Sequence, residues 1–184
     1  MNKKKLWIYA AVAAMFGVLG AQVAIKKDAP APVTTAIAPT GGPAHTATDK
    51  LFAQSLPDSA GKQQALAQWK GKALLVNFWA PWCAPCVREM PELASLAAEL
   101  RAKNVNVIGI GIDSPTNIAQ FAEKFKISYP LYVAGMSGTD IAREFGNQAG
   151  GLPYTVLIGA DGQVRKTYLG ELKFDQLRAD LAAL

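Results

Sequence analysis

Apolar residues follow two different periods along the chain, and their alternation predicts a sheet covered by helices. Continuous apolar runs at Ala73–Trp79, broken only by Asn77, and at Val105–Ile112 are typical of central strands buried on both faces. Between them, from about Ala84 to Lys103, apolar residues recur at helical spacing, as Val87, Met90, Leu93, Leu96, Ala97 and Leu100. Pro91 interrupts this helix, and we expect a kink there because proline has no N–H to donate.

The same alternation continues to the end of the chain. Ser114 as N-cap and Pro115 in the first turn start a helix that we expect to reach about Phe125. The elements that follow are a strand at Tyr129–Val133, a short helix at Thr139–Phe145, strands at Tyr154–Ile158 and Gln163–Tyr168 with the turn Asp161-Gly162 between them, and a terminal helix at Phe174–Ala183. This order predicts an α/β fold with a mixed central β-sheet flanked by helices.

Residues 1–27 have the pattern of a membrane anchor or a signal segment. A basic start, Met1–Lys5, precedes 20 uncharged residues, Leu6–Ile25, and a helix of that length spans about 30 Å of hydrocarbon. A cleaved signal peptide is the alternative, with Val18-Leu19-Gly20 as an acceptable cleavage site. Because the apolar run continues beyond that site, we favour an uncleaved anchor through residues 6–25, with the domain exported.

Residues 28–49 change composition sharply and predict a tether. Alanine, proline, threonine and glycine dominate, and such a segment buries too little apolar surface to order itself. The single histidine, His45, falls here, and we interpret it as a solvated linker residue. The domain is expected over residues 50–184; it begins with the apolar segment Leu51–Leu56, and Gln63–Trp69 fits either a short strand or a helical turn.

The charge of the chain gives no footprint for nucleic acid. The formal net charge is +5, and residues 1–49 carry five lysines against two aspartates, a net +3. The predicted domain therefore carries only +2 and has no run of lysine or arginine. We predict no nucleic-acid partner.

The two cysteines of the chain, Cys83 and Cys86, lie where the first predicted strand meets the first predicted helix. A helix N-terminus favours a thiolate, so Cys83 is the candidate nucleophile. Cys86 lies one turn further on, close enough to bond Cys83 and resolve a mixed disulfide. A zinc site lacks its other ligands, whereas a Cu(I) carrier and an inert bridge stay open as alternatives.

The residues around the cysteine pair resemble the thioredoxin superfamily, and within it the membrane-anchored, extracytoplasmic TlpA, ResA and CcmG (DsbE) branch of thiol–disulfide oxidoreductases. The resemblance covers about residues 50–184. It rests on Asn-Phe-Trp-Ala-Pro-Trp-Cys-Ala-Pro-Cys at 77–86, on Glu89-Met90-Pro91, and on Gly-Leu-Pro-Tyr-Thr at 151–155. The implied architecture is a thioredoxin-like fold.

The resemblance also implies roles for residues outside the cysteine pair. Pro153 matches the cis-proline that lies against the disulfide and helps to hold partner chains. Beside it, we expect Leu152 to bind the substrate and Trp82 to supply an apolar surface for docking it. Glu89 matches an acidic residue of this branch, and we expect it to be partly buried and to assist proton transfer at Cys86 or tune the cysteine pKa values. Asn77 departs from thioredoxins proper, which have a buried aspartate there.

Taken together, these residues predict a periplasmic enzyme on the outer side of the cytoplasmic membrane, or a soluble periplasmic one if the N-terminus is cleaved. We expect it to reduce disulfides, with apocytochrome c or copper-site assembly proteins as substrates implied by the resemblance. A DsbD/CcdA-like membrane protein is the implied electron donor, and no bound cofactor or metal is expected. A Cu(I)-binding module and a disulfide oxidase or isomerase are the alternatives.

Overall fold

The computed structural model describes residues 43–184, with side chains described from Ala47 onward. The predicted membrane segment at residues 6–25 and most of the predicted tether lie outside the described residues. Within 43–184, no helix combines the length and the apolar character needed to cross a bilayer.

The centre of the domain is a five-stranded mixed sheet with the strand order β5-β4-β3-β6-β7. The middle strand β3 (Ala73–Trp79) pairs in parallel with β4 (Val105–Gly111), which in turn pairs in parallel with β5 (Leu131–Val133). On its other side, β3 pairs antiparallel with β6 (Tyr154–Ile158), and β6 pairs antiparallel with β7 (Val164–Leu169). The mixed sheet expected from the sequence is confirmed.

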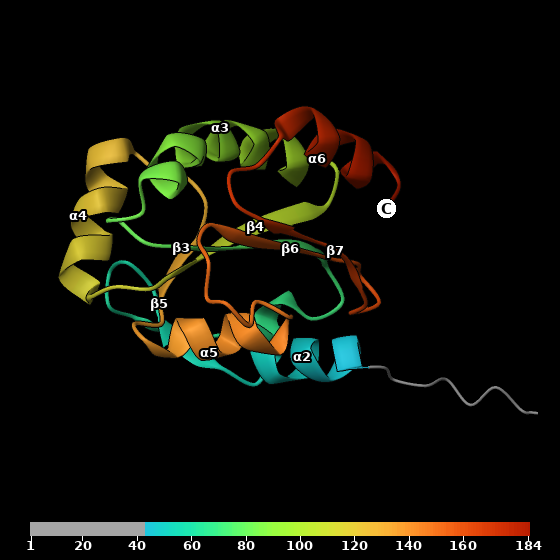
Figure 1. The fold of residues 1–184 in the computed structure, drawn as a ribbon, viewed down its shortest axis with the longest axis horizontal. Helices are drawn as coiled ribbons and strands as arrows, with labels where there is room; N and C mark the ends of the chain where they lie inside the picture. The colour runs from blue at the N-terminus through green and yellow to red at the C-terminus, as the bar shows by residue number, and fades with distance from the viewer. Residues whose placement is uncertain (1–42) are drawn as a thin grey trace, which may run out of the picture. The chain divides into compact units, whose positions relative to one another are not determined.

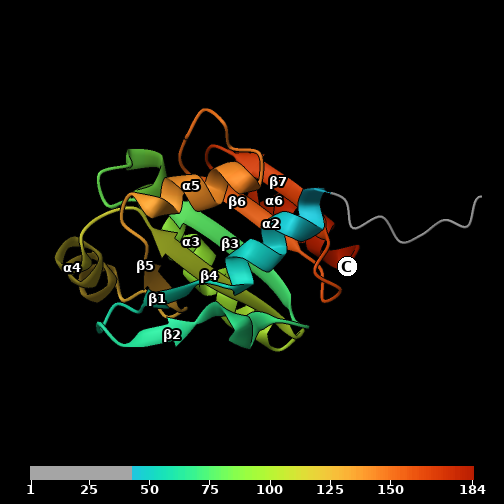
Figure 2. The same ribbon diagram turned by 90° about the horizontal axis from the view of Figure 1, so that it is seen from below.

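Helices cover both faces of this sheet (Figure 1). Helices α3 (Ala84–Arg101), α4 (Pro115–Phe125) and α6 (Phe174–Ala182) contribute to the core cluster on one face. Helices α2 (Pro43–Phe52) and α5 (Ser137–Glu144) lie over the other face, and Figure 2 views the sheet from their side. From β3 to the end of the chain, the observed order of elements is the one that the hydrophobic pattern predicted, and helix and strand ends there differ from the expected ones by two residues or fewer.

Helix α2 corrects the sequence prediction at the start of the domain. Residues 43–49 were expected to belong to the extended tether, yet the helix begins at Pro43 and runs to Phe52. Ala47, Leu51 and Phe52 are buried in the core beside α5, so packing against the sheet stabilises a helix that composition alone did not indicate. His45 therefore lies in α2 and not in an extended linker.

A small antiparallel hairpin lies between α2 and the central strand. It consists of β1 (Ser55–Pro57) and β2 (Gln63–Ala65), and a 3-10 helix follows at Leu66–Trp69. The sequence left a strand and a helical turn open for residues 63–69, and the segment contains one of each.

Two helices form where the sequence predicted them. The Ser114 side chain caps α4 by accepting the Asn117 backbone N–H at 3.2 Å, with Pro115 in the first turn. Helix α3 continues through Pro91 to Arg101, and its inner side is buried along its whole length.

The two faces of β3 bury different side chains. Leu74, Val76 and Phe78 belong to the core cluster on the α2/α5 face, whereas Leu75 and Trp79 belong to the cluster on the α3 face. Alternation along a strand therefore places the side chain of Asn77 on the α3 face, where it is fully buried.

Candidate active site

The cysteine pair occupies the turn that joins β3 to α3. Cys83 is the N-cap residue of α3, and Cys86 lies in the first helical turn, so the two sulfurs meet in a disulfide with an S–S distance of 2.04 Å. The Cys86 backbone N–H donates to Cys83 Sγ at 3.3 Å. Cys86 is completely buried, Cys83 is 6% exposed, and the neighbouring Trp82 is 67% exposed. Of the two cysteines, Cys83 is therefore the less buried.

The loop before β6 lies at the same edge of the sheet. Phe78 pairs with Tyr154, so Pro153 precedes β6 at the end of the sheet where β3 gives way to the cysteine turn. The Leu152–Pro153 peptide bond is cis, as the resemblance implied. Leu152 packs against the core cluster that contains both cysteines.

The side chain of Asn147 fixes the start of this loop. Its Nδ2 donates to the Gly151 carbonyl at 2.9 Å, and its Oδ1 accepts the Gly151 N–H at 3.1 Å. The Pro153 carbonyl also accepts the Gly170 N–H at 2.9 Å. These bonds hold the Leu152–Pro153 segment from both sides.

Glu89 lies one turn after Cys86 on α3 and is more deeply buried than the sequence predicted. It is 2% exposed instead of partly buried. Its Oε1 accepts the Asn77 side-chain N–H at 2.9 Å, and its Oε2 accepts the Leu172 backbone N–H at 2.8 Å. Burial raises the pKa of Glu89 to about 7, against the lowering effect of the two hydrogen bonds, and the charge of Glu171 raises it further.

Asn77 connects Glu89 to the neighbouring strand. Its Nδ2 also donates to Thr155 Oγ1 at 3.0 Å, and Thr155 is its cross-strand partner on β6. Both Asn77 and Thr155 are fully buried. A row of three buried polar side chains, Glu89, Asn77 and Thr155, therefore lies beneath the first turns of α3.

Sequence reasoning missed two members of this arrangement. Thr155 was part of the motif that carries the resemblance, two residues after Pro153, and a polar residue in an apolar strand is the signal that could have identified it. The Leu172 N–H gave no signal, because a backbone donor 83 residues away from Glu89 is brought there only by the fold.

The described residues contain no group of three or more His, Cys, Asp or Glu side chains arranged to hold a metal ion. The two cysteines are bonded to each other. A Cu(I) site at this position would require the disulfide to be reduced first and would rest on the two thiolates.

The site combines three features. A disulfide lies at the N-terminus of α3, a buried carboxyl lies one helical turn after Cys86, and the loop with the cis-proline lies at the same edge of the sheet. Such a site can support thiol–disulfide exchange. Fold and site together define a thioredoxin-like oxidoreductase. The chain matches the family model described as redoxin over residues 23–181 and belongs to that family, within the TlpA/ResA/CcmG-like part of the thioredoxin superfamily.

Curated relatives agree with this class. The thiol-disulfide oxidoreductase ResA of Bacillus anthracis is 36% identical over 126 residues, which cover 67% of this chain and 70% of the relative. The protein of the same name from Geobacillus thermodenitrificans is 29% identical over 130 residues, covering 70% and 72% of the two chains. The chain is an oxidoreductase.

Solved structures show the same fold. A thioredoxin-family thiol:disulfide interchange protein from Chlorobium tepidum is 26% identical, with a TM-score of 0.61 over 71% of this chain and 91% of that one. A secreted disulfide oxidoreductase of Mycobacterium tuberculosis, homologous to DsbE of E. coli, has a TM-score of 0.63 at 23% identity and covers 74% and 99% of the two chains, a likeness that shows the fold alone.

Proposed function

We propose that the protein is an extracytoplasmic reductant of disulfides in exported proteins, with Cys83 as the attacking residue and Cys86 as the resolving one. The observation that carries this proposal is the difference in burial within the pair: the cysteine that caps α3 is 6% exposed, and its partner is completely buried. An incoming disulfide therefore reaches Cys83 first. Trp82, Leu152 and Pro153 are proposed to bind the substrate chain.

The exchange proceeds in two steps. The Cys83 thiolate attacks one sulfur of the substrate disulfide, forms a mixed disulfide with it and releases the other sulfur as a thiolate. Cys86 then gives up its proton and attacks Cys83 Sγ, which breaks the mixed disulfide and releases the second substrate thiolate. The substrate gains two electrons, and the enzyme is left with the Cys83–Cys86 disulfide seen in the structure.

Glu89 is proposed to accept the Cys86 proton. It lies three residues after Cys86, so the two side chains are neighbours on the surface of the helix. A carboxyl whose pKa lies at about 7 can take up and release a proton near neutral pH, which an ordinary exposed glutamate cannot do. Its two fixed hydrogen bonds, from Asn77 and Leu172, keep it in place during this transfer.

The helix N-terminus supports the reducing direction. Among the described residues, one backbone N–H, that of Cys86, donates to Cys83 Sγ, and Pro85 inside the first turn has no N–H to add. A strongly oxidising pair requires a reduced form that is well stabilised as a thiolate. Limited stabilisation of the Cys83 thiolate therefore favours electron transfer from the enzyme to its substrate.

The cellular setting is proposed from the N-terminal sequence and from the relatives. Residues 6–25 would anchor the chain in the cytoplasmic membrane with the domain on the periplasmic side, as the basic start before them and their long uncharged run suggest. A DsbD/CcdA-like membrane protein would return the active site to the dithiol form. Apocytochrome c and copper-site assembly proteins are the proposed substrates.

Trapping of the mixed disulfide tests the proposed mechanism. Cys86→Ala should accumulate mixed disulfides with exported proteins through Cys83, because the resolving thiol is gone. Cys83→Ala is the matched control and should trap far fewer, since Cys86 is completely buried. Equal trapping by the two variants would contradict the assigned roles.

The reduction potential separates a reductant from an oxidase or isomerase. Equilibration with a glutathione buffer measures the reduction potential. We expect it to lie near that of thioredoxin, about −270 mV, and far from that of DsbA, about −120 mV. A value close to that of DsbA would overturn the proposed direction. Metal content after anaerobic purification addresses the Cu(I) alternative, and stoichiometric copper would favour it.

A further inference from the structure

Three buried polar atoms on the α3 face of the sheet have no hydrogen-bond partner within residues 43–184. They are Asn77 Oδ1, Trp79 Nε1 and Tyr129 Oη. Trp79 and Asn77 are fully buried, and Tyr129 is 4% exposed. An unpaired polar atom in a protein interior lowers stability, because it has lost its hydrogen bonds to water. Three such atoms on one face of the sheet suggest that they share a partner.

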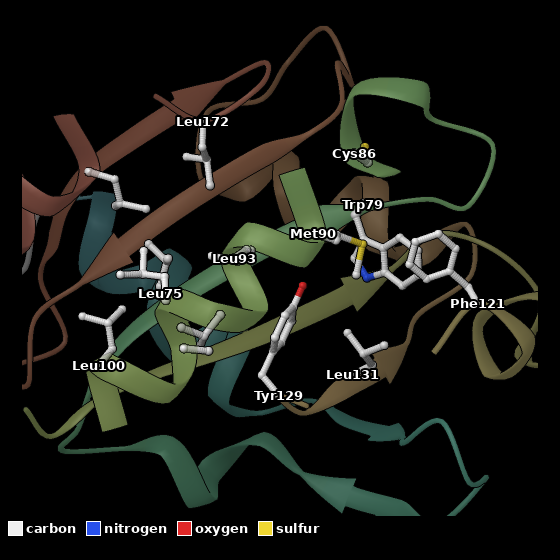
Figure 3. Close-up of a cluster of buried hydrophobic side chains, with 14 of the residues drawn as sticks. Leu75, Trp79, Cys86, Met90, Leu93, Leu100, Phe121, Tyr129, Leu131 and Leu172 are labelled. Carbon is white, nitrogen blue, oxygen red and sulfur yellow. The ribbon is translucent and has the colours of Figure 1, made fainter. Parts of the chain in front are cut away.

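Gly109 brings two of the three groups together. In the parallel pairing of β3 with β4, Gly109 stands directly opposite Asn77. A Cβ at this position would lie 2.5 Å from Leu131 Cδ2, 3.1 Å from Trp79 Nε1 and 3.3 Å from Tyr129 Cε2. The missing side chain thus lets the Leu131 methyl group, the indole N–H and the phenol ring all approach β4. Figure 3 shows the Tyr129 hydroxyl directed towards α3, with the indole nitrogen turned to the same side as Tyr129.

The amide of Asn77 presents its oxygen to the same place. Its Nδ2 donates towards β6, to Thr155, and towards α3, to Glu89. Because the amide is planar, with its oxygen and nitrogen on opposite arms, and Nδ2 is bonded to Thr155, we infer that Oδ1 lies on the Gly109 side. Thr155 and Gly109 are the two cross-strand neighbours of Asn77.

The three atoms are complementary to a single water molecule. Trp79 Nε1 is a donor only, Asn77 Oδ1 is an acceptor only, and the Tyr129 hydroxyl can be either. One water can accept from the indole and the phenol and donate to the amide oxygen. It then makes three hydrogen bonds, within the range of about two to four that buried waters make.

We propose that Asn77, Trp79 and Tyr129 form a binding site for one internal water, which extends the hydrogen-bond network of Glu89 across β4. Tyr129 is then a positioning residue for Glu89: it acts through the water and the Asn77 amide and does not touch the sulfurs. This inference rests on the proposed role of Glu89 in thiol–disulfide exchange.

The direction of the effect follows from the order of donors. A water that donates to Asn77 Oδ1 polarises the amide and strengthens its Nδ2–H bond to the Glu89 carboxylate. The network therefore favours the ionised form of Glu89. The other titratable group that acts on this carboxyl is Glu171, between β7 and α6, and Glu89 in turn adds to the effect of burial in raising the pKa of Tyr129.

Nuclear magnetic resonance of the full-length protein can detect the water. The Trp79 indole N–H, assigned by its loss in Trp79→Phe, should show a nuclear Overhauser effect to the water resonance although its side chain is fully buried. The signal should persist in Tyr129→Phe, which excludes the phenol proton as its source. Its absence from the unmodified protein, or its loss in Tyr129→Phe, overturns the proposed site.

The pH titration of the ¹³C-labelled Glu89 carboxyl tests the coupling. Tyr129→Phe should raise its midpoint by about a few tenths of a pH unit, because the water loses one of its donors. Tyr154→Phe is the matched control: its buried hydroxyl donates to the Phe145 carbonyl at 2.8 Å on the other face of the sheet. Equal midpoints in the two variants would overturn the role of Tyr129.

Both readouts are made on the disulfide form and need no substrate. They can therefore fail while Cys86→Ala still traps mixed disulfides, which would remove the water site and leave the proposed function intact. Conversely, a water signal and a shifted midpoint in a protein that traps nothing would leave the site intact and contradict the proposed function.

Discussion

The two faces of the central sheet differ in what they bury. The face under α2 and α5 receives Leu74, Val76 and Phe78 from β3, together with aliphatic and aromatic partners from β4 and β6. The face under α3 receives Leu75 and Trp79, but between them lies Asn77, hydrogen-bonded to Glu89 and Thr155. One strand thus contributes only apolar side chains to one side, and on the other side it also contributes Asn77, the middle member of the polar row.

This difference separates stability from chemistry. Apolar burial on the α2/α5 face stabilises the fold and places no demand on protonation. The α3 face buries a carboxyl whose pKa is raised to about 7, which costs stability once that carboxyl ionises. This carboxyl, Glu89, lies one helical turn after Cys86, where it can accept a proton during thiol–disulfide exchange. Substitutions on the two faces should therefore have separable effects.

The largest effect is expected on the apolar face. Phe78→Ala removes a fully buried ring that lies 6.3 Å from the rings of both Phe145 and Tyr154, and it should lower the free energy of unfolding by about 3–5 kcal/mol. Denaturant unfolding of the oxidised protein measures this loss. The Glu89 titration midpoint should stay unchanged, and a shift there would mean that the two faces are not separable.

Glu89→Gln should change how stability depends on pH. The pKa of Glu89 in the folded protein, about 7, lies above its ordinary value of 4.5, so the unfolded chain ionises first as the pH rises. The associated stability is complete below about 4.5 and is lost as the pH rises to about 7, a loss of roughly 3 kcal/mol. The variant should lack this loss.

Unfolding at pH 4 and pH 8, compared between Glu89→Gln and the unmodified protein, isolates this contribution, because the other carboxyls cancel in the difference. Parallel curves would show that Glu89 is not shifted. The proposed catalytic role makes a second demand: the pH dependence of thiol exchange should also change in Glu89→Gln, and an unchanged profile would remove Glu89 from proton transfer.

Thr155→Val should have a smaller effect. The substitution removes the hydroxyl that accepts from Asn77 at 3.0 Å, and a lost buried hydrogen bond costs about 1–2 kcal/mol. Thr167→Val, on the exposed side of β7, is the matched control and should be nearly neutral. Equal unfolding free energies for the two variants would mean that the polar row contributes nothing to stability.

The sequence predicted the features that local pattern determines. The apolar run at 73–79, the helical spacing after the cysteines and the cap at Ser114 each depend on neighbouring residues, and each matches the structure. Helix α2 did not follow from composition, because its stability comes from burying Leu51 against distant strands. Elements determined by neighbouring residues can therefore be predicted from the sequence, whereas those that depend on long-range packing cannot.

The candidate site divides in the same manner. The cysteine pair and the position of Pro153 could be identified from short motifs, whereas the full burial of Glu89 depends on the Leu172 backbone, 83 residues further along the chain. The sequence placed Glu89 on the correct helix but could not show what covers it. Tyr129 gave no polar signal at all, since a tyrosine in an apolar strand is ordinary.

The smallest effect is expected from a charge at the rim of the polar face. Glu171 pairs with Arg88 at 2.6 Å, both side chains are largely exposed, and its charge raises the pKa of Glu89. Glu171→Gln should lower the Glu89 midpoint by about a few tenths of a pH unit, since the negative charge is removed and Arg88 is left unpaired.

Glu99→Gln breaks a similar exposed pair, with Arg178 at 2.6 Å, and is the matched control. Both variants should leave the unfolding free energy nearly unchanged, because both ion pairs are solvent-exposed, but Glu171→Gln alone should move the Glu89 midpoint. A midpoint that stays unchanged in Glu171→Gln, or that moves equally in both variants, would show that the charge of Glu171 has no specific effect on the buried carboxyl.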